Sequence, residues 1–303
     1  MITTMRGIAD YEFERELGAG GRGRYFLARC PARLNRGGAG SSDSAAQPAV
    51  AVKVFAQEST SEGFRRATSR LRSFAAIRSP YLADYYDIGL HDGILYHAME
   101  YLAGGSLSAP DRTLGPPLRV RAVGDVARAL SALHRAGIVH GAVKPANVLI
   151  DPYGAKLADP DLSQIASPGQ RFAGVGPTAG IEFADPALLL GAPAAPAHDV
   201  WSVGLLLHWV VTGDSGYADL PRRDGLGTLR RVIAGRPRPA GTLPGPVADI
   251  VRSCLAPAAD RPTAAEVADR VAAVAADMAA VAAEAPGLTA VVGSAPALAR
   301  APG

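Results

Sequence analysis

The character of the sequence changes at residues 102–105, and this change constrains the fold more than any other feature. Before it, short apolar runs lie between turn residues, as in Ala49–Ala56 (AVAVKVFA), a pattern typical of strands. After it come longer stretches with helical spacing, the first being Leu118–Ala136, which Gly137 follows as a suitable C-cap. A β-rich first part followed by a helical remainder predicts an α+β chain with two lobes and a cleft between them.

Turn and periodicity signals place the other elements. Two strands are expected around the Gly-rich turn within Tyr11–Arg29, and two more around His-Asp-Gly within residues 83–102. Glu62–Ile77 is expected to be a helix that ends before Pro80. The later helices are expected at Val200–Thr212, Thr228–Ala234, Pro246–Leu255 and Ala264–Val281.

These expectations divide the chain into four parts. Residues 1–10 are an N-terminal extension, residues 11–103 a β-rich lobe (the N-lobe), residues 104–282 a helical lobe (the C-lobe) and residues 283–303 a tail. Pro31–Pro48 is rich in Gly, Ser, Ala and Pro with little to bury, so it is predicted to be a mobile loop between two strands. The tail shows no hydrophobic periodicity and carries little charge, so it is predicted to be disordered.

Charge and cysteine content argue against several classes of function. The net charge is +3, and the arginines are scattered among acidic residues, so no nucleic-acid partner is expected. Cys30 and Cys254 cannot form a disulfide framework and have no metal-ligand spacing with histidines. Met1–Glu16 carries charges throughout without an apolar core, and no run of about 18 apolar residues follows. A cytoplasmic protein without a membrane segment is predicted.

A glycine cluster and a lysine suggest phosphate chemistry. Gly18-Ala-Gly20-Gly-Arg-Gly23 is weak evidence alone, but a strand-like run follows it, whereas a helix would follow in a dinucleotide-binding unit. Lys53 comes about thirty residues later, on the strand VAVK. The order strand, glycine turn, strand and lysine places Lys53 where it would meet phosphate oxygens.

With these residues and five later motifs, residues 11–275 resemble the eukaryotic-type Ser/Thr protein kinase family in its bacterial form. MEYLAGGSL resembles the hinge, HGAVKPANVLID the catalytic loop, KLADPDLS the metal-binding DFG segment, HDVWSVG the D-x-W-S-x-G helix, and ADRPT the late Arg-Pro-Thr segment. The resemblance implies a bilobal kinase fold that uses ATP and Mg²⁺, with Asn147 and Asp159 as metal ligands. The implied nucleotide-contacting positions are Gly18, Gly20, Gly23, Tyr25, Lys53, Met99, Glu100 and Leu102.

The catalytic loop departs from the family pattern H-R-D-x-K-P-x-N. His140, Lys144 and Asn147 match, but Ala142 stands where the family has the Asp that accepts the substrate hydroxyl proton. A methyl group has no lone pair, and loss of a general base costs about 10²–10⁴ in rate. Gly141 replaces the Arg that reads phosphate on the activation loop.

The helix after the lysine strand also lacks an expected group. The family's spacing puts Arg70 at the position of the Glu that holds the lysine, and no Asp or Glu occurs between Gly63 and Ala83. Lys53 is therefore expected either to rotate away or to pair with Asp159. Glu62 lies about two turns, roughly 11 Å, from the family position and is not expected to replace the Glu.

Two further motifs are altered. Asp159-Pro160-Asp161 replaces DFG, so the Phe that packs on the helix after the lysine strand is lost, while Asp161 is either a solvated turn residue or a second carboxylate near a cation. Asp185-Pro186-Ala187 replaces A-P-E, so Arg261 loses its usual Glu partner unless Asp185 substitutes for it. Tyr25 replaces a small Val over the adenine site, where its ring would crowd the site or stack on the base.

The retained groups touch phosphate and metal, and the missing groups align and regulate transfer. The first interpretation is a pseudokinase that regulates or scaffolds an unknown protein partner, with nucleotide binding left open. The second is an active Ser/Thr kinase, for which Asp161 is the candidate base. The third is a structural module with a closed cleft.

Overall fold

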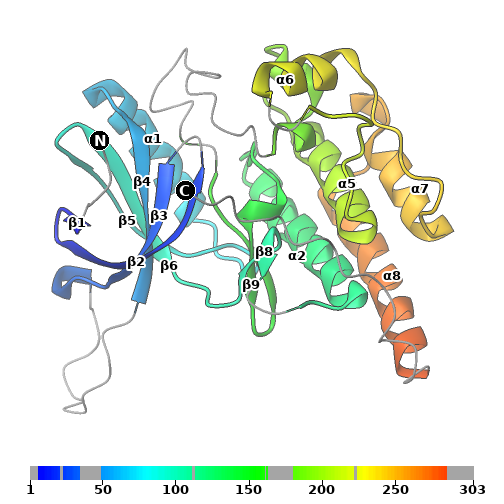
Figure 1. Ribbon diagram of the computed structural model, residues 1–303, viewed down its shortest axis with the longest axis horizontal. Coiled ribbons are helices and arrows are strands. Elements are labelled where there is room, and N and C mark those ends of the chain that lie inside the picture. The colour runs from blue at the N-terminus through cyan, green and yellow to red at the C-terminus, as the bar shows by residue number, and fades with distance from the viewer. Residues whose placement is uncertain are drawn as a thin grey trace.

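The computed structural model describes residues 6–20, 23–34, 49–110, 113–160, 162, 180–221 and 224–284. A β-sheet with one helix forms one part of the molecule, and a group of helices forms the other (Figure 1). The two-lobe α+β architecture predicted from the sequence is confirmed. The positions of the domain boundaries remain predictions, and residues 35–48 and 285–303, which include most of the predicted loop and the tail, lie outside the described residues.

The N-lobe contains a six-stranded antiparallel sheet. Its strand order is β1-β2-β3-β4-β6-β5, so strands that follow one another in sequence are mostly neighbours in space. Residues 7 and 8, within the predicted extension, pair with β2, and Ile8 is buried. The strands are β1 (Gly7–Ile8), β2 (Tyr11–Gly20), β3 (Gly23–Arg29), β4 (Ala49–Glu58), β5 (Tyr85–His91) and β6 (Ile94–Glu100).

Helix α1 (Ser61–Ala75) covers the sheet. Thr60 caps it, because its side chain accepts a hydrogen bond from the backbone N–H of Gly63 at 3.0 Å. The buried residues Ala67 and Leu71 of α1 pack with Phe55 of β4 and Leu95 of β6. The helix therefore holds one face of the sheet away from water, and its predicted position is confirmed with ends shifted by one or two residues.

A second, smaller sheet lies between the two lobes, with the strand order β10-β9-β7-β8. Its hairpin β9–β10 follows a short 3₁₀ turn at Pro145–Asn147 and was not predicted from the sequence. Leu157 of β10 accepts a hydrogen bond from the backbone N–H of Ala83, which ties this sheet to the N-lobe. The strands are β7 (Gly105–Ser106), β8 (Ala109–Pro110), β9 (Val148–Asp151) and β10 (Gly154–Leu157).

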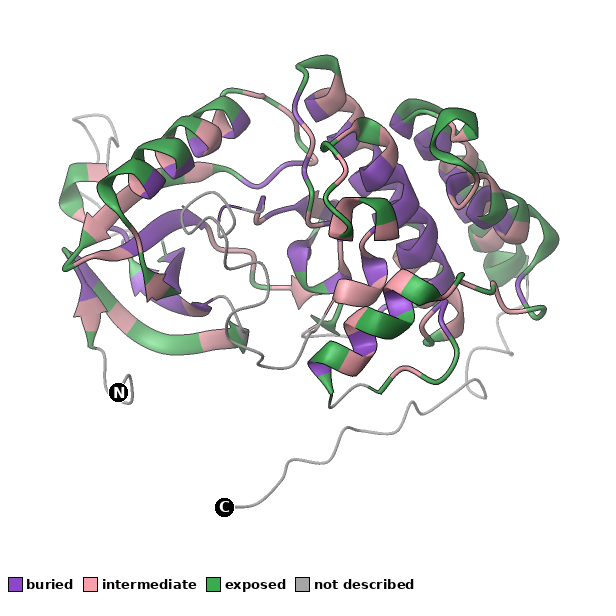
Figure 2. Ribbon diagram, turned by 90° about the horizontal axis from the view of Figure 1, so that it is seen from above, coloured by how far each residue is buried: buried purple, intermediate pink, exposed green. Residues whose placement is uncertain are grey.

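The C-lobe is built around α5, most of whose side chains are buried. Buried positions gather on the inward sides of the helices, whereas their solvent sides are polar or exposed (Figure 2). α2 and α8 run side by side next to α5 (Figure 1). None of the described helices is both long and apolar enough to cross a membrane. The helices are α2 (Pro116–Arg135), α4 (Pro186–Leu189), α5 (Pro196–Thr212), α6 (Gly225–Ala234), α7 (Gly245–Cys254) and α8 (Ala264–Glu284).

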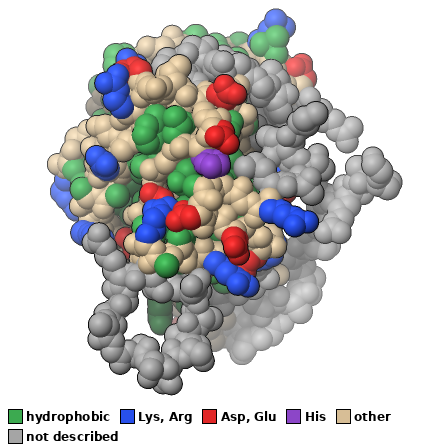
Figure 3. Space-filling model, turned by 90° about the vertical axis from the view of Figure 1, so that its left-hand side faces the viewer, with side chains coloured by type: hydrophobic (Ala, Val, Ile, Leu, Met, Phe, Trp, Pro, Cys, Tyr) green, Lys and Arg blue, Asp and Glu red, His purple; other side chains and the backbone are tan. Residues whose placement is uncertain are grey.

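The exposed end of the N-lobe carries mixed charges. On the face seen in Figure 3, arginine and lysine side chains lie among aspartates and glutamates instead of forming one basic area. Arg29 pairs with Glu14, and Arg33 pairs with Asp10 and Asp87. These neighbouring opposite charges are typical of a solvated surface.

Candidate functional site

Lys53 and Asp159 form an ion pair between the two lobes. The Lys53 ammonium nitrogen lies 2.6 and 2.7 Å from the two carboxylate oxygens of Asp159. Both side chains are largely buried, at 6% and 14% exposure. Of the two positions that the sequence left open for Lys53, the structure shows pairing with Asp159.

The register of the N-lobe sheet places Lys53 between two aromatic side chains. On β4, Lys53 stands opposite Tyr25 of β3 and His97 of β6. Its ammonium group lies 5.2 Å from the ring centre of Tyr25 and 4.8 Å from that of Phe55. The Tyr25 ring thus packs at the lysine end of the site, and the two roles expected for it over the adenine site stay predictions.

The hairpin β2–β3 contains the glycine cluster, and one of its glycines is required by close packing. Gly23 pairs with Phe55 across β3 and β4, and a Cβ atom on Gly23 would lie 2.4 Å from the carbonyl oxygen of Val54. Its φ of 152° also lies in a region that side chains rarely adopt. Gly18 and Gly20 lie on the opposite strand of the same hairpin.

His97 is a third polar side chain beside Lys53 and Asp159, and it was not among the residues predicted for the site. It is fully buried, and its Nε2 atom lies 3.8 Å from the Asp159 carboxylate, too far for a hydrogen bond. Among the described residues neither ring nitrogen has a hydrogen-bond partner. The sequence signal that could have drawn attention to it is a histidine within the mostly apolar strand ILYHAME.

The backbone at Asp159 is held in an unusual conformation. Asp159 has a φ of +58°, in the left-handed region that few residues other than glycine adopt. Its backbone N–H donates a hydrogen bond to the Tyr85 hydroxyl at 2.7 Å. The Tyr85 ring packs edge-on against His97, with 5.3 Å between the ring centres. Strand β5 therefore helps to aim the Asp159 carboxylate at Lys53.

Burial and the neighbouring charges shift the pKa values of Asp159, His97 and Tyr25. Burial, the largest single effect, raises the pKa of Asp159, but Lys53 and His97 together outweigh burial and hold that pKa well below its usual range. Burial lowers the pKa of His97 and Lys53 adds to this effect, so the ring is neutral. Burial and the nearby Asp159 charge raise the pKa of Tyr25 well above 10. The result is one buried anion with one buried cation as its counter-ion.

Asn147 lies beside Asp159. Its amide nitrogen donates hydrogen bonds to the carbonyl oxygens of Ala142 at 2.7 Å and Asp159 at 3.3 Å. The amide oxygen and the Asp159 carboxylate are the kind of hard oxygen ligands that Mg²⁺ binds. Groups of three or more His, Cys, Asp or Glu with metal-site geometry do not occur in the described parts of the chain. The donor set therefore fits Mg²⁺ held by two side chains together with phosphate oxygens, provided that Lys53 releases the carboxylate.

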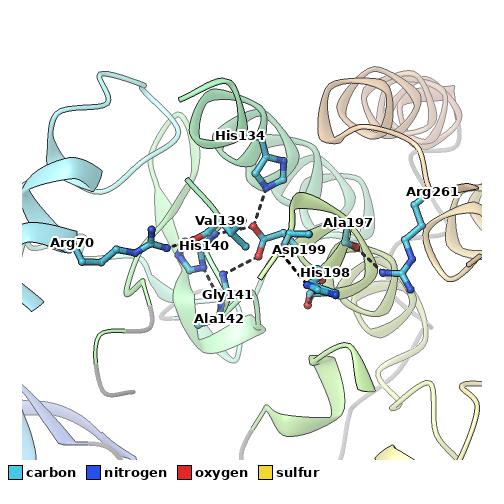
Figure 4. A network of polar contacts seen from close by, with 12 residues as sticks. Arg70, His134, Val139, His140, Gly141, Ala142, Ala197, His198, Asp199 and Arg261 are labelled. Atoms are coloured by element: carbon cyan, nitrogen blue, oxygen red, sulfur yellow. Dashed lines mark hydrogen bonds and ion pairs between the residues drawn. The ribbon is translucent and has the colours of Figure 1, made fainter. Parts of the chain in front are cut away.

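A buried carboxylate from α5 holds the loop that follows α2 (Figure 4). Asp199 accepts hydrogen bonds from the backbone N–H groups of His140 and Gly141, both at 2.8 Å, and contacts the His134 ring at 2.9 Å. Gly141 has a φ of +79°, which suits glycine. A charged acceptor on two backbone donors makes this loop rigid.

The ring of His140 adds a second constraint on this loop. Its Nδ1 atom accepts from the backbone N–H of Ala142 at 3.2 Å, and its Nε2 atom therefore donates to the carbonyl oxygen of Ala158, also at 3.2 Å. Burial lowers the pKa of His140, although the Asp199 and Asp159 charges oppose this effect. The loop thus has a defined conformation, and the side chain that it presents at position 142 is a methyl group.

Lys144, the retained basic residue of this loop, lies against the chain after the segment 163–179. A Cβ atom added to Gly180 would lie 2.5 Å from Cδ of Lys144, and Gly180 has a φ of +107°. Gly180 accordingly leaves room for the aliphatic part of the Lys144 side chain. Asp161, the candidate second carboxylate, lies outside the described residues.

Helix α1 contributes no acidic partner to Lys53. Glu62 is exposed and pairs with Arg65 and Arg66 on its own helix. Arg70, at the position where the resemblance implies a glutamate, donates a hydrogen bond to the carbonyl oxygen of Val139, next to the loop held by Asp199 (Figure 4). An arginine therefore joins α1 to the C-lobe at the place where a glutamate would face the lysine.

The DFG phenylalanine and its packing on α1 are absent, but another apolar side chain of the same segment packs on this helix. Leu162 is 1% exposed and belongs to the same buried cluster as Ala67 and Leu71 of α1. An aliphatic side chain three residues after Asp159 thus packs on the helix, because any apolar group that reaches this pocket gains from burial.

Asp185 does replace the missing glutamate partner of Arg261. The Arg261 guanidinium donates to Oδ2 of Asp185 at 2.5 Å and to the carbonyl oxygen of Ala197 at 2.8 Å. The other carboxylate oxygen accepts from the backbone N–H of Ala187 and caps α4. The guanidinium also lies 4.8 Å from the Trp201 ring centre. Arg261 therefore joins the start of α4 to the start of α5.

The predicted hinge positions lie at the end of β6 and directly after it, where the chain passes from one lobe to the other. Met99 is buried, and the Glu100 carboxylate pairs with Lys156 at 2.8 Å and accepts from the backbone N–H of Asp84. Leu102 accepts a hydrogen bond from the backbone N–H of Gly105 at 3.4 Å. Met99 belongs to a buried apolar cluster with Ala51, Ala83 and Ala158. That these positions hold a nucleotide base stays a prediction.

Comparison with known proteins agrees with this geometry. A family model described as "Protein kinase domain" matches residues 11–271. The serine/threonine-protein kinase PknK of Mycobacterium tuberculosis is 33% identical over 256 residues, which cover 78% of this chain and 23% of that protein. The serine/threonine-protein kinase PkaA of Streptomyces coelicolor is 30% identical over 293 residues, which cover 89% of this chain and 51% of that protein.

A third relative is more distant. The probable serine/threonine-protein kinase PkwA of Thermomonospora curvata is 27% identical over 266 residues, covering 86% of this chain and 33% of that protein. The chain spans between about a quarter and a half of the length of these three curated relatives. The similarity therefore concerns the part of each relative that matches this chain.

Proposed function

The chain belongs to the protein kinase domain family, and from this membership we propose that it is a degenerate member, a pseudokinase that regulates or scaffolds a protein partner. Its output is then a conformation of the two lobes, set by what occupies the site around Lys53 and Asp159. The protein partner is not identified, and the cytoplasmic location expected from the sequence stays a prediction.

The proposal rests on Ala142, which stands at the position of the family's proton-accepting Asp. Its loop is held by Asp199 and His140 in a defined conformation, so the side chain at this position is fixed in place. In the family pattern that side chain takes the proton of the attacking hydroxyl. A methyl group cannot accept a proton, and the expected loss is about 10²–10⁴ in rate from this change alone.

The ion pair between Lys53 and Asp159 supports the same proposal. The lysine that would meet phosphate oxygens is bound to the carboxylate that would hold a metal. Mg²⁺ supplies charge neutralisation of phosphate oxygens when it is bound. In this chain Asp159 and Asn147 would hold that ion, and Lys53 would contact the phosphates after it separates from Asp159. Nucleotide binding therefore competes with a buried ion pair.

Incubation of the purified protein with ATP labelled at the γ-phosphate, Mg²⁺ or Mn²⁺ and a mixture of Ser/Thr peptide substrates tests the proposal. We expect no incorporation above that of Asp159→Ala, a variant without the metal-binding carboxylate. The variant Ala142→Asp is measured in parallel. If phosphate is incorporated only with this change, the missing base is the reason why the unchanged chain is inactive. Sustained incorporation by the unchanged chain that disappears in Asp159→Ala would show an active Ser/Thr kinase.

A thermal-shift titration separates a nucleotide-responsive regulator from a scaffold with a closed site. A nucleotide present at about 100 times its dissociation constant adds roughly 2.7 kcal/mol to the free energy of unfolding. We expect ATP with Mg²⁺ to raise the melting temperature only at high concentration, because the Lys53–Asp159 pair has to open. If ATP, ADP and Mg²⁺ all fail to shift the melting temperature, scaffolding is the only proposed function that remains.

A further inference from the structure

A polar pocket lies where one segment of the N-lobe meets two helices of the C-lobe that are distant from it in sequence. It has a volume of about 370 Å³ and is formed by the segment between α1 and β5, the second half of α2, and the first part of α8. It shares no residue with the site around Lys53 and Asp159. A volume of this size suits a small ligand or one or two side chains of a bound peptide.

Three arginines line this pocket, and together with one carboxylate they make it positive. Arg78 comes from the segment after α1, while Arg128 and Arg135 lie two turns apart on α2. Asp269 of α8 is the only acidic residue among the lining residues, so the formal charge of the lining is 3 − 1 = +2. The hydroxyl groups of Ser79, Tyr81 and Ser131 also line the pocket.

The existing partners of the arginines leave donors for a ligand. Arg128 uses its Nη1 atom on the buried Asp125 at 3.1 Å, and its guanidinium lies 5.5 Å from the Tyr81 ring centre. Arg135 donates to a neutral acceptor, the Ser131 hydroxyl, at 2.8 Å. Arg78 lies 3.8 Å from Asp84, with both side chains more than half exposed, which makes this a weak pair. Since a guanidinium has five N–H donors, each arginine retains several.

The rest of the lining is apolar. Pro80 and Ala132 form one part of it, and Ala265 and Ala268 of α8 form another. Carbon atoms next to an anionic group would pack against these residues. Planar guanidinium groups that converge on one hollow are the arrangement that binds phosphate in a bidentate way, and clusters of them recognise phosphorylated residues.

We propose that this pocket binds a phosphate monoester, either on a phosphorylated serine or threonine of a peptide or on a free small molecule of the same chemistry. The dianion would bind to Arg78, Arg135 and the remaining donors of Arg128. The pocket joins the N-lobe segment at Arg78 to two C-lobe helices, so an occupied pocket ties the lobes together far from the nucleotide-contacting positions.

Isothermal titration calorimetry tests this with four probes: inorganic phosphate, free O-phosphoserine, a short Ala/Gly peptide with a central phosphoserine, and the same peptide unphosphorylated. We expect the three phosphate-bearing probes to bind and the unphosphorylated peptide not to bind. The double variant Arg78→Ala/Arg135→Ala should weaken binding at least about tenfold, and Asp269→Asn should strengthen it, because repulsion is removed. Tighter binding of the phosphopeptide than of O-phosphoserine identifies a peptide ligand, and equal binding identifies a small molecule.

A matched control separates the pocket arginines from a general loss of surface charge. Arg230→Ala/Arg236→Ala removes the same charge from exposed positions on and after α6 and should leave binding unchanged. Both pocket arginines are exposed, so melting temperatures of the pocket variant should match those of the unchanged protein. The proposal is overturned if no phosphate-bearing probe binds, or if the pocket variant binds as well as the unchanged chain.

Discussion

Lys53 and Asp159 are 106 residues apart in the chain, and the lysine ammonium nitrogen contacts both oxygens of the aspartate at 2.6 and 2.7 Å. The lysine belongs to the central part of the N-lobe sheet, while the aspartate follows the small sheet of the C-lobe. This ion pair therefore connects the two lobes directly. It also occupies both groups that the family uses to bind nucleotide and metal.

Breaking this pair from one side should destabilise the protein strongly. Lys53→Met leaves the Asp159 carboxylate buried without its counter-ion, which costs about 3–5 kcal/mol of unfolding free energy. Lys53→Met/Asp159→Asn should cost less than the sum of the single changes, because no charge remains buried. Denaturant titrations measure this. The control Arg252→Met removes one side of an exposed pair with Asp249 and should cost no more than about 1 kcal/mol. An equal loss of stability in Lys53→Met and Arg252→Met would contradict the argument from burial.

His97 should make stability fall as the solution becomes mildly acidic. Burial lowers the pKa of His97 below its ordinary value of 6.5, so the unfolded chain takes up a proton at a higher pH than the folded chain does. Stability is therefore lost as the pH falls below 6.5 and continues to fall until the folded-state pKa is reached. Burial also lowers the pKa of His140 and His208, which act in the same direction.

His97→Leu isolates the contribution of this one ring. The variant should gain stability relative to the unchanged protein as the pH is lowered from 7.5 to 5, as measured by urea unfolding at each pH. At neutral pH it should be at least as stable, because two ring nitrogens without hydrogen-bond partners among the described residues are removed. His91→Leu, a change at an exposed histidine, should give a curve parallel to that of the unchanged protein. A parallel curve for His97→Leu would refute the prediction.

Asp185 should be as necessary to the C-lobe as the glutamate that it replaces. Asp185→Ala leaves the largely buried Arg261 guanidinium without its carboxylate and removes the cap of α4, for a loss of about 3–5 kcal/mol. Adding Ala187→Glu puts a carboxylate back at the position where the resemblance implies one. The double variant should recover part of the lost unfolding free energy, whereas Ala187→Glu alone should not stabilise the protein. Failure of the double variant to recover stability would show that Arg261 cannot change partners.

Arg70→Glu should weaken the hold of Lys53 on Asp159 and so favour binding of ATP with Mg²⁺. It removes the hydrogen bond to Val139, at a cost of about 1 kcal/mol, and offers Lys53 a second carboxylate at the family position. Lys53 is then shared between two acids, so Asp159 is more available to Mg²⁺. The thermal shift caused by ATP with Mg²⁺ should be larger than in the unchanged protein. Arg70→Gln keeps a neutral side chain of similar length and should show no such increase.

Local pattern and spacing were sufficient to predict most of the fold. The glycine hairpin, the lysine strand, α1 and five C-lobe helices (α2, α5, α6, α7 and α8) were predicted close to their observed positions, because periodicity and turn residues act over short stretches of chain. The hairpin β9–β10 was missed, since four-residue strands next to a loop carry too little periodic signal. The absence of a carboxylate at position 142 follows from the sequence alone.

The tertiary structure decided which side chains became partners. The sequence left Lys53 with two possible positions, left Arg261 with a possible substitute partner, and provided no reason to expect that Leu162 packs on α1 or that His97 faces Asp159. Each of these contacts lies between residues more than about 60 positions apart in the chain. Such contacts depend on distances of a few ångströms that are set when the sheets and helices pack, whereas residue identity along the chain determines only which groups are available.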